Sequence, residues 1–171
     1  KATDGANNEE TAGAGNTFKY DTTAPATIIV LPTNNGTYSS LANITGTASD
    51  ATSGVANVKL KIKNVTDTTY WNGAWVTADP GYVLSASGTT NWTYADPGWV
   101  SGKQYLVIAQ ATDNATNVET AGAGNSFTYD TVAPTSSINN PGHATTVYAA
   151  PTISGTASDA TTGVGNVKLW L

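Results

Sequence analysis

The chain has 171 residues, a net charge of −5 at pH 7, no cysteine and only 11% charged residues. This balance excludes nucleic-acid partners, which need a basic surface, and no apolar run reaches the about 18 residues of a membrane span, so we expect no membrane insertion. The absence of cysteine fits a prokaryotic surface protein or a cytosolic one, and the richness in Thr, Asn, Gly and Ala favours an extracellular location at the cell surface.

Long segments of the chain occur twice, 109 residues apart. Residues 2–25 and 111–134 match at 18 of 24 positions without a gap, and residues 44–60 and 153–169 match at 14 of 17. A fixed long period is the signature of a tandem array. The sequence therefore predicts three parts: the C-terminal end of a preceding repeat (1–22), a complete repeat (23–131) and the N-terminal part of a following repeat (132–171).

The preceding repeat is expected to end in a strand over residues 16–20. Phe18 and Tyr20 alternate with polar residues there and would face a core. Residues 21–25 then form a short, stiff linker, because Pro25 fixes its own φ and lacks an N–H.

The first half of the complete repeat contains short alternating runs. We expect strands over residues 28–31 and 41–49, and a third where Val58, Leu60 and Ile62 alternate with lysines. Asn72-Gly73 predicts a hairpin with a type I′ turn, because both of its central residues tolerate positive φ. Residues 78–89 should form loops.

The second half contains three further strands. One carries Trp92 and Tyr94 on one face, and the last is marked by Phe127 and Tyr129. Between them runs a strand whose core face is formed by Tyr105, Val107, Ala109 and Ala111. Short strands, frequent turns and no helical periodicity predict an all-β, antiparallel β-sandwich.

Several stretches resemble bacterial immunoglobulin-like domains, which occur as tandem arrays in large adhesins and other surface proteins. The resemblance rests on Asp21–Pro25, Gly46–Asp50 with Ser53–Val55, Tyr70-Trp71, Trp92–Tyr94 and Ala109–Asp113. It implies an immunoglobulin-like β-sandwich, with Tyr105 placed as a tyrosine corner, and an extracellular setting, but no ligand. One departure is visible: the family often has Ala-Gly-Asn after the aspartate of the sixth strand, where this chain has residues 114–117.

Oxygen-bearing side chains are expected to converge where the linker enters the complete unit. In such a sandwich the loops after residues 49 and 113 lie at that pole. Ca²⁺ takes 6–8 oxygen ligands, so the predicted calcium site at the joint between repeats consists of Asp21, Asp50, Asp113, Asn117 and Glu119. The alternative is that Asp50 and Asp113 cap their own turns through hydrogen bonds to the backbone.

Five Asn-X-Ser/Thr sequons are candidate glycosylation sites: Asn35, Asn43, Asn64, Asn91 and Asn114. About four are expected by chance in this composition. None of the repeat counterparts inside the chain keeps the sequon. We therefore interpret them as incidental, unless the host glycosylates its surface proteins.

The tryptophans could form a platform that stacks on sugars, or they could pack in the core and at interfaces. Alternation predicts that Trp92 is buried and that Trp71 packs near the hairpin. Trp170 falls on the lysine face of its strand, so we expect it to be exposed or to contact a neighbour.

No catalytic constellation is visible, and the chain is not expected to be an enzyme. His143 is the only histidine, and there is no cysteine to pair with it as a nucleophile. An internal Lys–Asn isopeptide bond is also not expected, because the strand lysines alternate onto the wet face.

The sequence therefore predicts a structural segment of an extracellular tandem-repeat protein, built as a stalk, filament or layer. Its partners would be neighbouring repeats or identical chains. Two alternatives stay open: an adhesive module that binds a glycan or a surface protein, and a spacer domain of a secreted hydrolase.

Overall fold

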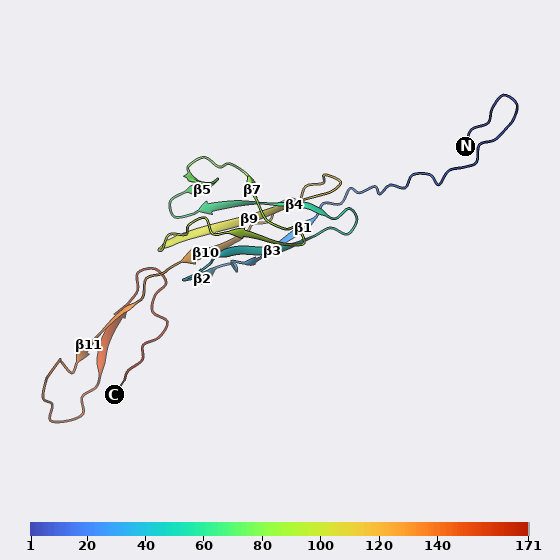
Figure 1. Cartoon of the computed structure of the whole chain (residues 1–171). Helices are drawn as coiled ribbons and strands as arrows, with labels where there is room; N and C mark the ends of the chain where they lie inside the picture. Colours follow the sequence, from blue (N-terminus) through green and yellow to red (C-terminus); the bar gives the residue numbers. More distant parts are fainter. Residues whose placement is uncertain (171) are drawn as a thin grey trace.

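The structure is a computed structural model that describes residues 1–170; Leu171, the last residue of the predicted third part, lies outside the described residues. The described chain forms twelve strands: β1 (Ala26–Leu31), β2 (Gly36–Tyr38), β3 (Asn43–Ser49), β4 (Val55–Asn64), β5 (Thr69–Trp71), β6 (Trp75–Val76), β7 (Leu84–Ser85), β8 (Asn91–Ala95), β9 (Lys103–Asp113), β10 (Asn125–Tyr129), β11 (Thr135–Asn140) and β12 (Ser154–Ser158). Figure 1 shows a body of packed strands, β1 to β10, from whose opposite ends the N-terminal segment and the β11–β12 part extend.

The body contains two sheets. The smaller one has the order β1-β3-β8 and is antiparallel throughout. The larger one has the order β2-β10-β9-β4-β5-β6, with β7 paired to β4, and it is antiparallel except for the parallel pair β2–β10. The all-β class and the antiparallel pairing are thus confirmed, in a β-sandwich-like arrangement.

The core lies between the two sheets, where the alternating residues of each strand point inward. β4 and β9 are the longest strands, and their predicted alternation is confirmed: Val58, Leu60 and Ile62 are fully buried, as are Tyr105 and Val107. Burying each such side chain contributes about 1.5–3 kcal/mol, so this strand pair accounts for much of the hydrophobic stabilisation.

Trp92 of β8 covers the core from the smaller sheet. It lies opposite Gly46 of β3, where an added Cβ would come within 2.1 Å of the Trp92 ring. Glycine is therefore required at this position because the indole occupies the space that a side chain would fill.

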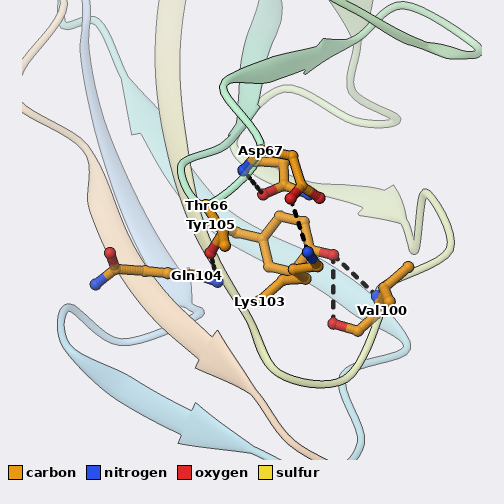
Figure 2. A network of polar contacts seen from close by, with 7 residues as sticks. Thr66, Asp67, Val100, Lys103, Gln104 and Tyr105 are labelled. Carbon is orange, nitrogen blue, oxygen red and sulfur yellow. Dashed lines mark hydrogen bonds and ion pairs between the residues drawn. The ribbon is translucent and has the colours of Figure 1, made fainter. Parts of the chain in front are cut away.

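Tyr105 ties the start of β9 to the preceding turn. Its hydroxyl accepts a hydrogen bond from the N–H of Val100 at 2.9 Å, and next to it Lys103 pairs with Asp67 at 2.7 Å. Figure 2 shows the phenol ring running toward Val100, between this ion pair and the backbone turn. The contact of Tyr105 with a residue five positions upstream is the geometry that a tyrosine corner requires.

The hairpin after β5 differs from the predicted type I′ turn. Trp71 pairs with Trp75, so the loop has three residues, and among them only Gly73 has a positive φ, of 106°. The Asn72 side chain instead accepts a hydrogen bond from the N–H of Ala74. The loop is therefore one residue longer than predicted, and the rings of the two paired tryptophans contact each other at a tilt of 56°.

The predicted strand over residues 16–20 is not formed. Phe18 and Tyr20 are 88% and 81% exposed, whereas their repeat counterparts Phe127 and Tyr129 lie in β10. β10 forms because β9 and β2 flank it on either side. Within the described residues the segment 16–20 has no such neighbours, so its alternation alone does not produce a strand.

The C-terminal part contains a single hairpin, in which β11 pairs with β12. Residues 164–170, the counterpart of β4, form no strand in the described chain. In the part of the chain that the structure describes, no helix has the length and apolar character needed to cross a bilayer.

Candidate functional site

Three acidic side chains meet at the joint where the linker enters the complete unit. Asp21 comes from the linker, Asp50 follows β3, and Asp113 ends β9. One carboxylate oxygen from each lies within 4.8 Å of one from each of the others. The topology brings them together because β3 and β9 both end at this pole of the body. Of the five predicted ligands, these three form the cluster.

The Asp50 carboxylate also caps its own turn, as the alternative interpretation predicts. Its Oδ1 atom accepts hydrogen bonds from the N–H groups of Thr52, Ser53 and Gly54 at 2.8–3.1 Å. No hydrogen bond to Oδ2 is found among residues 1–170. Turn capping therefore uses one oxygen and leaves the other free to act as a ligand.

Asn117 links the β9–β10 loop to the linker. Its Nδ2 donates to the Asp113 carboxylate at 2.8 Å and to the backbone oxygens of Asp21 and Thr23 at 3.2 and 3.4 Å. Its backbone N–H donates to Asp113 as well, at 2.8 Å. Asn117 thus belongs to the joint, where its amide nitrogen contacts both Asp113 and the linker.

Glu119 lies outside the cluster, which corrects its predicted place among the ligands. Its two carboxylate oxygens accept hydrogen bonds from the N–H and hydroxyl of Thr27 and from the N–H of Ala111. The side chain is directed to β1 and β9, where Thr27 and Ala111 lie, and not to the three clustered aspartates. There it fastens β1 to β9.

Two of the clustered carboxylates, those of Asp113 and Asp21, have a lowered pKa. Burial acts to raise the pKa of Asp113, but hydrogen bonds from the side chain and backbone of Asn117 outweigh it, so this pKa lies below its usual value. Hydrogen bonds from Ser53 and from the N–H of Thr23 lower the pKa of Asp21, against burial and the neighbouring charge of Asp113. Asp113 and Asp21 are therefore both ionised at neutral pH, and they lie close together at this pole.

This arrangement has the chemistry of a hard-cation site. Carboxylate oxygens and backbone or amide carbonyls are the ligands of Ca²⁺, which accepts irregular geometries and completes its shell with water. A bound divalent cation would relieve the repulsion between the carboxylates, which come from three separate parts of the chain. It would therefore connect the linker to the body.

Ser53 is a joint residue that the sequence reasoning did not identify. Its N–H donates to Asp21 Oδ2 at 3.1 Å, so it connects the loop after β3 directly to the linker. The available signal is the repeat itself. The counterpart of Ser53 is Thr162, which keeps the hydroxyl although the side chain differs.

A second joint repeats the geometry of the first, 109 residues along the chain. Asp159 accepts the N–H groups of Thr161, Thr162 and Gly163 at 2.8–3.0 Å, as Asp50 does in its own turn. Asp130, the counterpart of Asp21, accepts the Thr162 hydroxyl at 2.8 Å and the N–H of Val132 at 3.0 Å. Two of the three carboxylate positions are thus rebuilt in space.

The five sequons have different environments. Asn35, Asn43 and Asn91 are exposed. Asn64 is buried, and its amide donates to Asp67 at 2.9 Å, so this sequon is not accessible in the folded unit. Asn114 is exposed, but its amide nitrogen is held by the backbone oxygens of Ser53 and Gly54.

The tryptophans of the complete unit do not form an exposed platform. Trp92 and Trp99 are buried, and Trp71 and Trp75 contact each other in a tilted arrangement, with Trp75 against Tyr105. Trp99 donates its indole N–H to the backbone oxygen of Leu41 at 2.9 Å. Trp170 is 93% exposed, and His143 lies in an exposed loop.

No protein-family model matches the sequence, and no curated protein matches it at a significant level. The functional argument therefore rests on the joint geometry and on the internal duplication.

Proposed function

We propose that the chain is a structural segment of an extracellular tandem-repeat protein, in which immunoglobulin-like units are joined end to end into a stalk, filament or layer. The observation that carries this proposal is the twice-built joint, with the same turn and the same linker aspartate at both ends of the complete unit. The sheet orders β1-β3-β8 and β2-β10-β9-β4 support the immunoglobulin-like assignment. The partners of each unit are its neighbours in the array.

The joints hold neighbouring units in a fixed orientation. Thr162 bonds Asp130 directly, and the linker is only five residues long, with a proline at its end. A short linker with hydrogen-bonded ends restricts the angles between units far more than a flexible chain would. Units joined end to end in a fixed orientation can project from a surface or cover it without further contacts between chains.

The orientation is tested by spin-label distances, because the chain has no native cysteine to interfere. Labels on Thr120→Cys in the β9–β10 loop and Ser154→Cys in β12 should give one narrow distance distribution. Thr162→Val, which keeps the side-chain shape and removes the bond to Asp130, should broaden it. Two glycines inserted after Thr131 provide the flexible reference. A wild-type distribution as broad as that reference would overturn the proposal.

Calcium binding at the acidic cluster would strengthen the first joint. At a calcium concentration about 100 times the dissociation constant, a site present only in the folded state adds about 2.7 kcal/mol to the free energy of unfolding. We therefore expect the melting temperature to fall on addition of EDTA and to recover with excess Ca²⁺.

Two variants separate calcium binding from turn capping. Asp50→Asn should abolish the calcium response. Asp159→Asn is the matched control, because Asp159 caps an identical turn but has only one neighbouring carboxylate, Asp130. It should lose stability through the turn and keep the response. A melting temperature that EDTA leaves unchanged in the wild-type chain would refute the calcium site.

A further inference from the structure

The chain contains two Asn-Gly pairs, and the asparagine of each is exposed in a turn of the complete unit. Asn35-Gly36 leads into β2, and Asn72-Gly73 lies in the loop between β5 and β6. Such a pair can react with itself, because glycine has no side chain to keep its peptide nitrogen away from the amide carbon of the preceding asparagine. The reaction requires that these two atoms approach each other, and the two pairs differ in this respect.

Asn35-Gly36 is held in place on both sides. The N–H of Gly36 donates to the backbone oxygen of Thr33 at 3.0 Å, so the nitrogen that would attack is already engaged. The N–H of Asn35 donates to the backbone oxygen of Ser126 at 2.7 Å, and its side-chain oxygen accepts the Ser126 hydroxyl at 2.9 Å. A Cβ added at Gly36 would meet side-chain atoms of Thr33 and Tyr38 at 2.7 Å. This pair therefore has little freedom to bring its reacting atoms together.

Asn72-Gly73 has the opposite environment. Among residues 1–170, no hydrogen-bond acceptor is found for the N–H of Gly73, and a Cβ added there would meet no atom within 4 Å. The φ of Gly73 is 106°, in a region that glycine enters easily. The Asn72 side-chain oxygen accepts the N–H of Ala74 at 3.3 Å. This hydrogen bond closes a ring around the Gly73 peptide, which keeps the Asn72 amide close to the free nitrogen.

We infer that Asn72 is a self-modification site, at which the chain converts its own asparagine into aspartate and isoaspartate. The Gly73 nitrogen forms a bond to Cγ of Asn72, and the side-chain amide leaves as ammonia with the proton that the nitrogen has lost. Water then opens the resulting cyclic imide at either carbonyl, which gives aspartate or isoaspartate. Water is the only co-reactant. The site belongs to the complete unit, so the inference does not depend on the proposed array.

Isoaspartate would also alter a contact between the two sheets. In this product the main chain runs through the former side chain, so the loop between Trp71 and Trp75 becomes longer by the Cβ atom of Asn72. These tryptophans pair directly, and the Trp71 indole N–H donates at 3.1 Å to the hydroxyl of Tyr94 in the smaller sheet. A longer loop loosens this bridge, whereas aspartate at the same position leaves the main chain unchanged.

Peptide mapping by mass spectrometry compares the two pairs within one molecule. The whole folded chain is kept at mildly alkaline pH, and the conversion of Asn72 and Asn35 is followed over time. Asn72 should react at least about tenfold faster, which corresponds to a difference of about 1.4 kcal/mol in activation free energy. In the chain unfolded with urea the two rates should become similar, because both turns are then released.

Two variants of Asn72 serve as matched controls. Asn72→Gln should remove the reaction at this site and leave Asn35 unchanged, because glutamine would have to close a larger ring. Asn72→Asp carries the charge of the products on an unaltered main chain. The indole N–H signal of Trp71 in NMR spectra should therefore keep its position in Asn72→Asp and shift in the purified isoaspartate form.

Three results would overturn the inference. The first is an Asn72 that stays unconverted in the folded chain while the unfolded chain reacts. The second is equal conversion of Asn35 and Asn72 in the folded chain. The third is the same Trp71 signal in the isoaspartate form and in Asn72→Asp, which would exclude the loosened bridge. None of these measurements involves the joints, so this inference and the proposed function fail separately.

Discussion

Asp113 is the most buried carboxylate of the acidic cluster, at 1% exposure, and both of its oxygens accept hydrogen bonds from Asn117. The free-energy cost of removing this carboxylate from solvent is offset by its hydrogen bonds only while the carboxylate is ionised. The residue therefore makes the stability of the unit depend on pH in the acidic range below the usual aspartate pKa.

The sign of that dependence follows from the lowered pKa of Asp113. Below the usual aspartate value of 3.8, the unfolded chain takes up a proton that the folded chain still excludes. Stability is therefore fully present above that value and is lost as the pH falls through the folded pKa. We expect Asp113→Asn to reduce the proton uptake on unfolding in this window, which makes the dependence shallower. Urea unfolding at several pH values between neutrality and strong acid measures it, and an unaltered slope would contradict the argument.

At the scale of a strand, Gly46 shows how one position fixes the contact between neighbouring elements. A Cβ there would meet the Trp92 ring at 2.1 Å and the backbone oxygen of Ile28 at 2.3 Å. Neither neighbour can move freely, because the ring lies in the core and the carbonyl belongs to the β1–β3 pair. Gly46→Ala should destabilise the unit by about 1–3 kcal/mol.

Gly122→Ala is the control for this substitution. Gly122 has no atom within 4 Å of an added Cβ, and its φ is not in the left-handed region. The free energy of unfolding of the Gly122→Ala variant should therefore stay within about 0.5 kcal/mol of the wild-type value, as for most surface substitutions. Equal effects at the two positions would show that β8 does not depend on the space above Gly46.

Strands whose apolar and polar residues alternate clearly could be predicted from the sequence. In β4 the lysines occupy every second position, so their face must be the solvent-exposed one and the other face must be buried. β2 could not, because three residues carry no period and its pairing with β10 depends on a partner about 90 residues away. Trp99 follows a Pro-Gly turn outside any alternating run, so nothing local indicates its burial. Asn72-Gly73 marks the correct turn, but its length is set by the pairing of Trp71 with Trp75, which the turn residues alone do not indicate.

The acidic cluster was predictable in part, because two of its three members, Asp50 and Asp113, stand at the ends of recognisable strands. The direction of each strand determines at which end of the sandwich the following loop lies. Asp50 and Asp113 could therefore be placed at the same end from the sequence alone. Glu119 could not be excluded in this way. It is only two residues beyond Asn117, and a small change in the course of the loop separates the pole from the flank.

At the scale of the whole molecule, the buried side chains lie mainly in the part of the chain between the two linkers. Phe18, Tyr20, Tyr148 and Trp170 are all more than 80% exposed, whereas Tyr105 and Phe127 are buried. Brief digestion with chymotrypsin should therefore cut at the exposed aromatic residues first and leave a fragment that contains residues 21–134. Mass spectrometry identifies the cuts, and the thermally unfolded chain serves as the reference. Early cleavage at Tyr105 or Phe127 would contradict this distribution of order.

The parallel pair β2–β10 has a consequence for a unit pulled by its two ends. The linkers leave from opposite poles, so tension runs along the strands rather than across them (Figure 1). β10 leads directly into the second linker and lies between β9 and β2. Its hydrogen bonds are then loaded together in shear instead of being unzipped one after another from an end. Mechanical failure requires all of them to break in a single event, and the forced unfolding rate of the unit depends on this short strand.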